Sequence, residues 1–296
     1  MALNSNYKLS LIQWYPGHIA KAEKKLQEQL KLVDVVLEVR DTRIPLATHH
    51  PHLDKWIGSK KKIVILNRVD MIFPEVRQQW QDWFKSQGQT VYFSNAKQGI
   101  GAASILKAAQ SAAGDVNKRR RKRGMLPRPI RAVVIGFPNV GKSALINRLL
   151  KRKIVESAAR PGVTRQLRWV RISQEVELLD APGVIPLKLE DQEAALKLAI
   201  CDDIGQASYD KQIAAAAFVD LLTQMEVTHG HLLPQEALKS RYGVDTTSLS
   251  GEEYIRVLAD NRYQGNIDRS TSHILTDFRK GNLGQIPLEL PPLENQ

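Results

Sequence analysis

A phosphate-binding motif lies near the middle of the chain. Residues 136–143 read G-F-P-N-V-G-K-S, between an apolar run typical of a strand and a helical pattern. Glycines at these positions let backbone N–H groups converge on phosphate oxygens, and the start of the following helix adds partial positive charge. We expect Lys142 to reach the β- and γ-phosphates and the Ser143 hydroxyl to bind Mg²⁺. The residues expected to line the phosphates are Asn139, Val140, Gly141, Lys142, Ser143 and Ala144.

A second group of residues has the chemistry of a magnesium-dependent switch. Residues 180–183 read D-A-P-G at the end of the apolar run VELL, where the Asp180 carboxylate can hold Mg²⁺ through water. The amide of Gly183 can then sense the γ-phosphate. Thr164 lies between the two motifs in the irregular segment RPGVTRQ. A threonine there can complete the Mg²⁺ shell only while a γ-phosphate is present, which predicts a nucleotide-controlled switch.

Two segments nearer the N-terminus have the chemistry of base recognition. Residues 67–70 read N-R-V-D after the run KKIVIL, and Asn95, Ala96 and Lys97 follow the run TVYF. A carboxylate accepts from both N1–H and the exocyclic amine of guanine, a pair of donors that adenine lacks, so Asp70 is predicted to select GTP over ATP. We expect Asn67 to tether neighbouring loops and the Arg68 stem to cover the ring. A backbone amide of residues 95–97 is expected to meet the guanine oxygen.

The order of these motifs is the reverse of that in a Ras-like sequence, because the base-binding segments precede the phosphate-binding ones. A parallel sheet can be cut and rejoined at other loops without changing which strand ends face the ligand. We therefore predict a circularly permuted GTP-binding domain, with the rejoined connection running through a basic linker at residues 114–130.

With these motifs the chain closely resembles the circularly permuted GTPases, and among them the ribosome biogenesis GTPase A family. Arg68 stands where lysine is usual and Asn95 where serine is usual, so we expect a somewhat altered affinity for the base. The resemblance covers nearly the whole chain and rests on WYPGHIAKA at 14–22, DVVLEVRDTRIPL at 34–46, NRVD at 67–70, GFPNVGKS at 136–143, RPGVT at 160–164, DAPG at 180–183 and FRKGNLGQIPLE at 278–289.

The resemblance implies a GTP-hydrolysing factor for assembly of the large (50S) ribosomal subunit. Such a factor binds ribosomal RNA and the precursor particle in its GTP state and is released on hydrolysis, and its C-terminal helical domain also contacts RNA. The alternative is a GTP-dependent RNA-binding placeholder in which turnover is incidental. The intact phosphate, magnesium and switch motifs favour the GTPase.

The resemblance also implies how hydrolysis is catalysed. Val184 and Ile185 follow the D-A-P-G motif, where a Ras-like enzyme has a glutamine that orients water. Similar GTPases use a histidine from a Pro-Gly-His motif, which matches residues 16–18, so His18 is predicted to orient the water. A surface histidine at a helix start is the alternative. Asn139 matches the asparagine with which similar GTPases hold K⁺ beside the phosphates.

The elements that must position these residues follow an α/β pattern. Apolar runs at 33–39, 61–66, 90–93, 131–136 and 176–179 alternate with helical patterns such as that at 21–32. This arrangement predicts a mostly parallel sheet covered on both faces, and alternation at 167–172 adds an edge strand. After about residue 186 only helical patterns occur, at 191–200, 209–222, 233–242, 251–262 and 270–280. We therefore predict a P-loop GTPase domain at 1–188 and an all-α domain at 189–296.

Charge is distributed unevenly along the chain, whose net charge is +12. Residues 201–296 hold 8 of the 43 Lys and Arg residues but 14 of the 31 Asp and Glu residues, so the polyanion-binding surface is expected on the first two thirds. In the acidic C-terminal part, Arg279 and Lys280 are the expected RNA contacts. The densest basic run is Lys118, Arg119, Arg120, Arg121, Lys122 and Arg123, for which an RNA contact and an extended, solvated linker both remain open.

Composition also narrows the setting of the protein. The single cysteine, Cys201, cannot form an internal disulfide, which fits a reducing compartment, and no apolar run is long enough to span a membrane. We expect a monomer in the cytoplasm or an organelle matrix. Histidines 49, 50 and 52 lie in one loop, but they lack the spacing and the carboxylates of a metal site.

Overall fold

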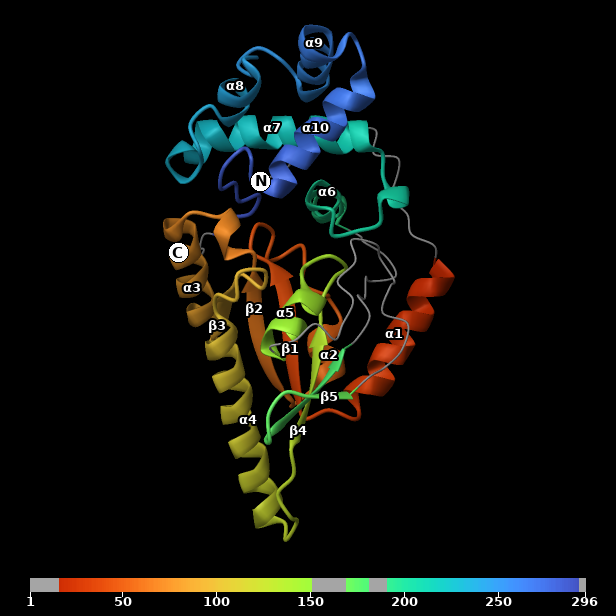
Figure 1. The fold of residues 1–296 in the computed structure, drawn as a ribbon, viewed down its shortest axis with the longest axis vertical. Coiled ribbons are helices and arrows are strands. Elements are labelled where there is room, and N and C mark those ends of the chain that lie inside the picture. Colours follow the sequence, from red (N-terminus) through yellow and green to blue (C-terminus); the bar gives the residue numbers. More distant parts are fainter. Residues whose placement is uncertain (1–15, 151–168, 181–190, 293–296) are drawn as a thin grey trace. The chain divides into compact units, whose positions relative to one another are not determined.

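The computed structural model describes residues 16–150, 169–180 and 191–292 of the chain (Figure 1). These residues divide into two compact units, one with residues 16–69, 81–150 and 169–180 and the other with residues 70–80 and 191–292. We call them the α/β unit and the helical unit. The predicted domain boundary at residues 188 and 189 lies outside the described residues.

A six-stranded sheet forms the centre of the α/β unit. Its strand order is β3-β2-β1-β4-β6-β5, and all neighbours are parallel except β5, which runs antiparallel at the edge. The mostly parallel sheet and its edge strand are therefore confirmed. The strands are β1 (Val35–Asp41), β2 (Lys61–Asn67), β3 (Val91–Ser94), β4 (Ile130–Ile135), β5 (Trp169–Arg171) and β6 (Val176–Asp180).

Helices cover both faces of this sheet (Figure 1). Buried leucines of α1 and α2 pack with Val36, Val133 and Leu179 in one apolar cluster. The other face is covered by α4, which lies against β2, β3, β4 and β6 and also contacts α5. Along the chain, the helices that alternate with these strands are α1 (Pro16–Leu30), α2 (Leu53–Ile57), α3 (Pro74–Ser86), α4 (Ala102–Lys122) and α5 (Lys142–Leu149), with a 3₁₀ turn, η1 (Val69–Met71).

The register of the parallel strands places the predicted motifs at one edge of the sheet. Asp41, Asn67 and Ser94, the last residues of β1, β2 and β3, are partners across the three strands. On the other side of β1, Asp180 at the end of β6 is paired with Val134 of β4, just before the phosphate motif. Base and phosphate segments distant in sequence therefore lie at the same carboxyl-end edge of the sheet, with β1 between β2 and β4.

The basic run does not form the extended linker that like-charge repulsion favours, which was one of the two alternatives left open by the sequence. Helix α4 continues through this run to Lys122, and the chain turns back at Gly124 to enter β4. Lysine and arginine have high helix propensity, and basic side chains near a helix C-terminus interact favourably with its dipole. The linker reading is thus wrong for residues 114–122, which are helical.

The helical unit is built around α7, whose buried side chains include Phe218, in ring contact with Phe278 of α10. Helices α6, α9 and α10 pack on α7, and Asp210, Ser250 and Asn266 cap helix N-termini. Residues 191–292 contain no strand, as predicted. Its helices are α6 (Gln192–Cys201), α7 (Lys211–His229), α8 (Ala237–Tyr242), α9 (Gly251–Tyr263) and α10 (Ile267–Lys280), with 3₁₀ turns η2 (Gln206–Ser208) and η3 (Gly230–Leu232). None of the helices described is long and apolar enough to cross a bilayer.

Candidate nucleotide-binding site

Two glycines shape the loop between β4 and α5. Gly136 has φ 151°, and a Cβ there would lie 2.2 Å from the Val39 carbonyl oxygen. Gly141 has φ 103°, and a Cβ there would lie 2.2 Å from the side-chain nitrogen of Asn67. Both positions need a residue without a side chain, because backbone conformation and space each exclude one. The loop therefore approaches β1 and β2 closely, as a phosphate-binding loop must.

The first turn of α5 begins at the end of this loop. Lys142 is buried, and its Nζ donates to the Phe137 carbonyl oxygen at 2.7 Å. Ser143 and Ala144 are half-buried beside it. The ammonium group is thus held over the loop whose backbone would surround the phosphates.

The donor set for Mg²⁺ has the right chemistry. The Ser143 hydroxyl lies at the start of α5, and Asp180 ends the strand next to β4. Hydroxyl and carboxylate oxygens are ligands that Mg²⁺ prefers. The Asp180 side chain, Thr164 and Gly183 lie outside the described residues, so their predicted roles stay predictions.

Asn67 joins the phosphate loop to the base loops. Its side-chain nitrogen donates to the Val140 carbonyl at 2.8 Å, and its side-chain oxygen accepts from Ser94 Oγ and from the Ala96 amide, both at 3.0 Å. The residue is 3% exposed, so these hydrogen bonds form away from solvent. The geometry is what the predicted tethering role requires, and it adds Ser94, which the sequence analysis missed.

Arg68 is held by an ion pair that the sequence analysis also missed. Its guanidinium donates to the Asn139 carbonyl at 2.7 Å, and its Nε lies 3.3 Å from Asp41 Oδ2. Asp41 also accepts from the Nε of Arg43 at 3.0 Å and from its terminal nitrogen at 2.7 Å. Burial alone would raise the pKa of the Asp41 carboxyl, but the guanidinium groups of Arg43 and Arg68 outweigh it and hold the pKa below its ordinary value. Arginine at this position thus links the phosphate loop to β1.

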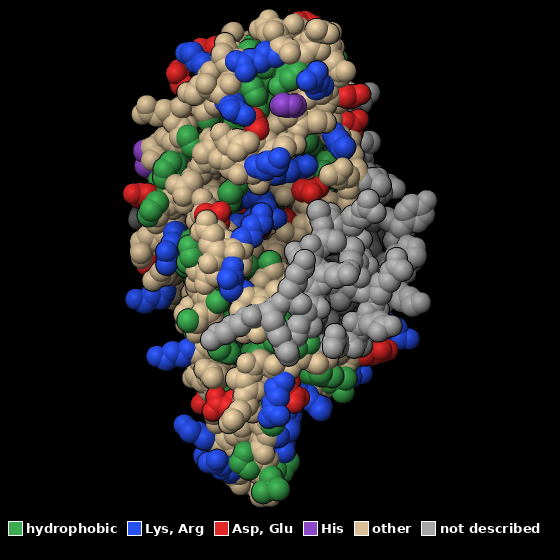
Figure 2. Space-filling view, viewed as in Figure 1, with side chains coloured by type: hydrophobic (Ala, Val, Ile, Leu, Met, Phe, Trp, Pro, Cys, Tyr) green, Lys and Arg blue, Asp and Glu red, His purple; other side chains and the backbone are tan. Residues whose placement is uncertain are grey.

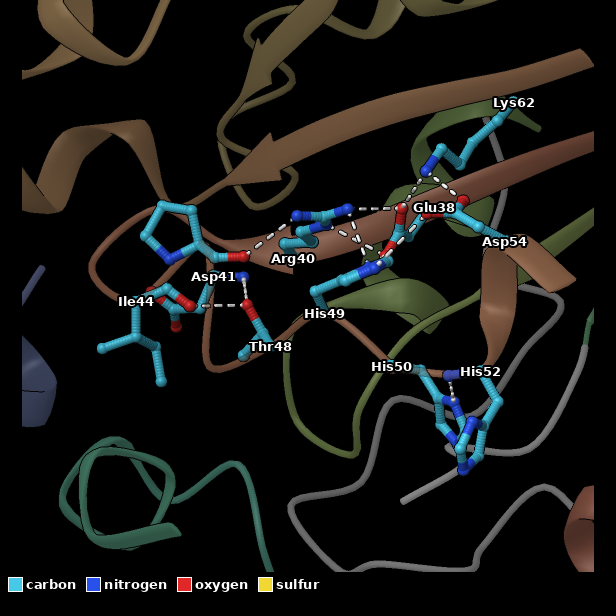
Figure 3. Close-up of polar contacts among 11 residues, drawn as sticks. Glu38, Arg40, Asp41, Ile44, Thr48, His49, His50, His52, Asp54 and Lys62 are labelled. Carbon is cyan, nitrogen blue, oxygen red and sulfur yellow. Dashed lines mark hydrogen bonds and ion pairs between the residues drawn. The ribbon is translucent and has the colours of Figure 1, made fainter. Parts of the chain in front are cut away.

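A polar network fixes the loop that follows β1 and so positions Asp41 (Figure 3). Arg40 makes two hydrogen bonds to Glu38, both 2.9 Å, and also donates to the Pro45 carbonyl. Burial would raise the pKa of Glu38, but the charge of Arg40 and the hydrogen bond with His49 hold it well below its ordinary value. Thr48 donates to the Ile44 carbonyl at 2.7 Å and accepts from the Asp41 amide at 3.1 Å. The Asp41 amide is therefore fixed by the loop that follows β1.

The loop after β3 is closed by its own side chains and by α5. Asn95, at a position where serine is usual, accepts at its side-chain oxygen from the amides of Lys97 and Gln98, both at 3.1 Å, and so closes the loop. Arg148, in the last turn of α5, donates to the Ala96 carbonyl at 3.3 Å and to the Lys97 carbonyl. The Ala96 amide, a candidate donor to the guanine oxygen, already donates to Asn67.

For two other predicted site residues, the structure gives the position in the backbone. Asp70 lies in η1, two residues after Arg68, and its carboxylate is exposed. His18 lies in the first turn of α1, which begins at Pro16, a favoured residue at that position. The His18 side chain lies outside the described residues.

Of the three neighbouring histidines, His49 contacts Glu38, whereas His50 and His52 contact each other and Trp56. His49 Nδ1 lies 2.7 Å from Glu38, whereas His50 is buried with its ring 4.6 Å from that of Trp56. Burial, with the charges of His52 and His49, lowers the pKa of His50 to about 4, so its ring is neutral at pH 7. In the part of the chain that the structure describes, no three His, Cys, Asp or Glu side chains form a metal site.

These elements define a P-loop GTPase domain in which the base loops precede the phosphate loop along the chain. Residues 131–228 match the family described as 50S ribosome-binding GTPase. Two relatives, both named ribosome biogenesis GTPase A, come from Bacillus pumilus and Bacillus cereus. The first is 35% identical over 95% of this chain and 99% of its own length, the second 36% over 95% and 94%.

A solved structure shows the same fold. GNP-bound YlqF from Thermotoga maritima superposes with a TM-score of 0.63 at 24% identity, over 92% of this chain and 98% of that one. The chain belongs to the ribosome biogenesis GTPase A family. It is a GTP hydrolase, as predicted, and the predicted circular permutation agrees with this family.

Arg148 provides a first test of the site. We expect Arg148→Ala to raise the Kd for both GTP and GDP about fivefold, because losing its charged hydrogen bonds to the loop after β3 costs about 1 kcal/mol at this exposed position. Equilibrium titration with a fluorescent guanine nucleotide measures the effect. Lys85→Ala removes an exposed basic residue from the last turn of another helix and is the matched control. Equal affinities for the two variants would remove Arg148 from the site.

Proposed function

We propose that this GTPase acts in assembly of the large ribosomal subunit, binding a precursor particle with GTP and leaving it after hydrolysis. The observation that carries the proposal is one connected site. Asn67 and Arg68 of the base segment hydrogen-bond to Val140 and Asn139 of the phosphate loop. Nucleotide binding must therefore act on both segments together. The names of the relatives support the ribosomal role. In this proposal the protein acts in the cytoplasm or an organelle matrix.

In this proposal Mg²⁺ is held by Ser143, by Thr164 in the GTP state and by Asp180 through water. Bound Mg²⁺ neutralises charge that develops on the phosphates. Lys142 supplies a second positive charge, and Gly183 reports whether the γ-phosphate is present. Asn139, in a left-handed backbone conformation with φ 57°, is the proposed K⁺ ligand. Asp70 and the loop from Asn95 to Lys97 bind the base.

His18 is the proposed residue that orients the attacking water. We expect His18→Ala to bind GTP like the wild type but to lose about 100-fold or more of its turnover in the presence of large subunits, as for loss of a general base. Phosphate release and nucleotide titration are measured on the same samples. His52→Ala, an exposed histidine of the α/β unit, is the control. Wild-type turnover by His18→Ala would make His18 a surface histidine at a helix start.

We also propose that both units contact RNA: the α/β unit hydrolyses GTP and supplies most of the salt-dependent affinity, and the helical unit adds local contacts that place the protein. The structure gives Arg279 a competing role, because its guanidinium donates to the carbonyls of Ala199 and Ile200 and to Tyr209 at 2.8 to 2.9 Å. These contacts satisfy the C-terminus of α6. Lys280 is exposed and remains the better candidate of the pair for an RNA contact.

One comparison separates the proposed switch from a placeholder. Phosphate release from GTP is measured under multiple-turnover conditions with and without purified large ribosomal subunits. A switch is stimulated by the subunits, whereas a placeholder hydrolyses GTP at the same rate in both conditions. Absence of stimulation, together with retained binding to the particle, would replace the proposal with the placeholder.

A further inference from the structure

The end of α4 and the segment that returns from it form a projecting arm. We call residues 114–129 the basic arm. The buried residues of α4 end at Ala113, and none of residues 114–129, all of which the structure describes, is buried. Helix α4 has 21 residues and is about 30 Å long, so its last turns extend beyond the sheet (Figure 1). Several Lys and Arg side chains lie near this end of α4 on the face shown in Figure 2.

Hydrogen bonds hold the two sides of the basic arm together. The Asn117 side chain donates to the Arg128 carbonyl at 3.0 Å and accepts from the Arg128 amide at 3.1 Å. Arg120 donates to the Leu126 carbonyl at 3.1 Å. At the base of the arm, the Arg128 guanidinium makes two hydrogen bonds to Asp34, of 2.9 and 3.0 Å. The arm is therefore a hairpin whose two sides are joined by hydrogen bonds.

The charge of the basic arm is large and is not neutralised within it. The arm holds seven basic residues and one acidic residue, Asp115, whose carboxylate is 3.8 Å from Lys61. Among the described residues, none of residues 118–123 takes part in an ion pair. A favourable interaction with the helix dipole needs only one or two cations in the last turn. Arg119 and Arg120 donate to backbone carbonyls of the arm, but these neutral partners do not offset the mutual repulsion of the charges.

The basic side chains point in several directions around the helix axis. At 3.6 residues per turn, Arg119 and Arg121 lie about 160° apart. Lys118 and Lys122 lie between them on the side opposite Arg120, which faces the returning segment. A flat polyanion can contact only one side of such a helix. Phosphates on two sides are needed to pair with Arg119 and Arg121 at once.

The tip of the basic arm is apolar. Met125 is 39% exposed and Leu126 is 83% exposed, and a single glycine separates them from the basic run. Exposed apolar side chains at the end of a charged arm fit a site that presents unstacked bases beyond the phosphates, as single-stranded loops and bulges of folded RNA do.

We propose that the basic arm inserts end-on into a cleft of folded RNA, with phosphates on both sides of α4 and unpaired bases against Met125 and Leu126. The identification of this RNA as ribosomal rests on the proposed function. The mode of insertion does not. Arg119 and Arg121 contact opposite walls of the cleft. Insertion makes both charges contribute to binding, because each displaces counterions from a separate strand of RNA.

The test uses the full chain and RNA purified from large ribosomal subunits. Arg119→Gln and Arg121→Gln are each expected to lower affinity and to reduce the slope of log K against log salt by about one unit. Leu126→Gln is expected to lower affinity and leave this slope unchanged. Lys107→Gln, an exposed position of α4 before the arm, is the matched control and should change neither quantity. Thermal unfolding of each variant checks the fold.

Each outcome decides the inference. Effects of both arginine variants on the slope support insertion. An effect of only one indicates binding to a flat surface and overturns it, and so does an effect of neither. An unchanged affinity of Leu126→Gln overturns the placement of bases at the tip. If the substitutions weaken binding to vesicles of phosphatidylserine and phosphatidylcholine more than they weaken binding to RNA, the arm binds a membrane surface instead.

The inference and the proposed function can fail separately. GTP turnover without RNA should be the same in all four variants, since none lies in the nucleotide site. Stimulation of the wild type by large subunits tests the proposed function, whereas the two-sided salt effect tests the arm. A two-sided effect without stimulation would keep the arm and reject the proposed function. Stimulation without a two-sided effect would do the opposite.

Discussion

Lys142→Ala is expected to lose almost all GTP binding and, with it, turnover. The Lys142 ammonium is buried over the phosphate loop and donates to the Phe137 carbonyl at 2.7 Å. Bound phosphates would offer this group a doubly or triply charged acceptor in place of one neutral carbonyl. Charge-assisted hydrogen bonds of this kind are about twice as strong as neutral ones. We expect a loss of about 100-fold or more in affinity for GTP.

Two measurements on the same protein check this prediction. Nucleotide titration gives the affinity, and the shift of Tm with added GTP reports binding to the folded state. Lys107→Ala removes an exposed lysine from α4 and should keep the wild-type shift. A Lys142→Ala protein with an unchanged Tm in the absence of nucleotide but a full GTP-dependent shift would show that the phosphate site is elsewhere.

The position of the site could be predicted because each motif follows an apolar run. Parallel strands with helical connections bring their carboxyl ends to one edge, so residues after the runs at 61–66, 90–93 and 131–136 had to converge. The observed pairing of Asp41, Asn67 and Ser94 across three strands is this convergence. Strand length and spacing were enough for this step.

The contacts that hold the site together could not be predicted from sequence. Arg68 forms an ion pair with Asp41, and Arg148 donates to the loop after β3. In each case the two partners are distant in sequence, and no local pattern links them. Their pairing depends on strand order, which hydrophobic periodicity does not report. The D-T-R-I-P-L segment at 41–46 was the available signal, because it formed part of the family resemblance without any assigned chemistry.

Residues with several possible uses were also hard to assign. The run at 118–123 reads as an extended linker by charge and as a helix by propensity, and packing of the preceding turns of α4 on the sheet decides for the helix. Arg279 looked like an RNA contact because it is basic, but its carbonyl partners at the end of α6 come from residues about 80 positions earlier. Such tertiary capping leaves no trace in local sequence.

Asp70→Asn is expected to change the base preference of the site from guanine to xanthine. The carboxylate accepts from the N1–H and the 2-amino group of guanine, whereas an amide presents one donor that faces this amine. Xanthine has a carbonyl oxygen at that position and can accept from the amide. GTP binding should therefore weaken by about 2 to 4 kcal/mol, since one donor of the bound guanine loses its charged acceptor and faces an amide donor instead, and XTP binding should gain.

Competition between GTP and XTP for a fluorescent guanine nucleotide measures this change. The substitution should not disturb the backbone, because the Asp70 carbonyl, which accepts from Gln285 at 3.1 Å, is unaltered. Glu75→Gln removes an exposed carboxylate close by in α3 and should keep the preference for GTP. Weaker binding of both nucleotides would indicate damage to the fold. Asp70 is the only carboxylate in N-R-V-D, so it is the only residue of this motif that can accept from both guanine donors. Unchanged GTP affinity would therefore mean that a group outside this motif recognises the base.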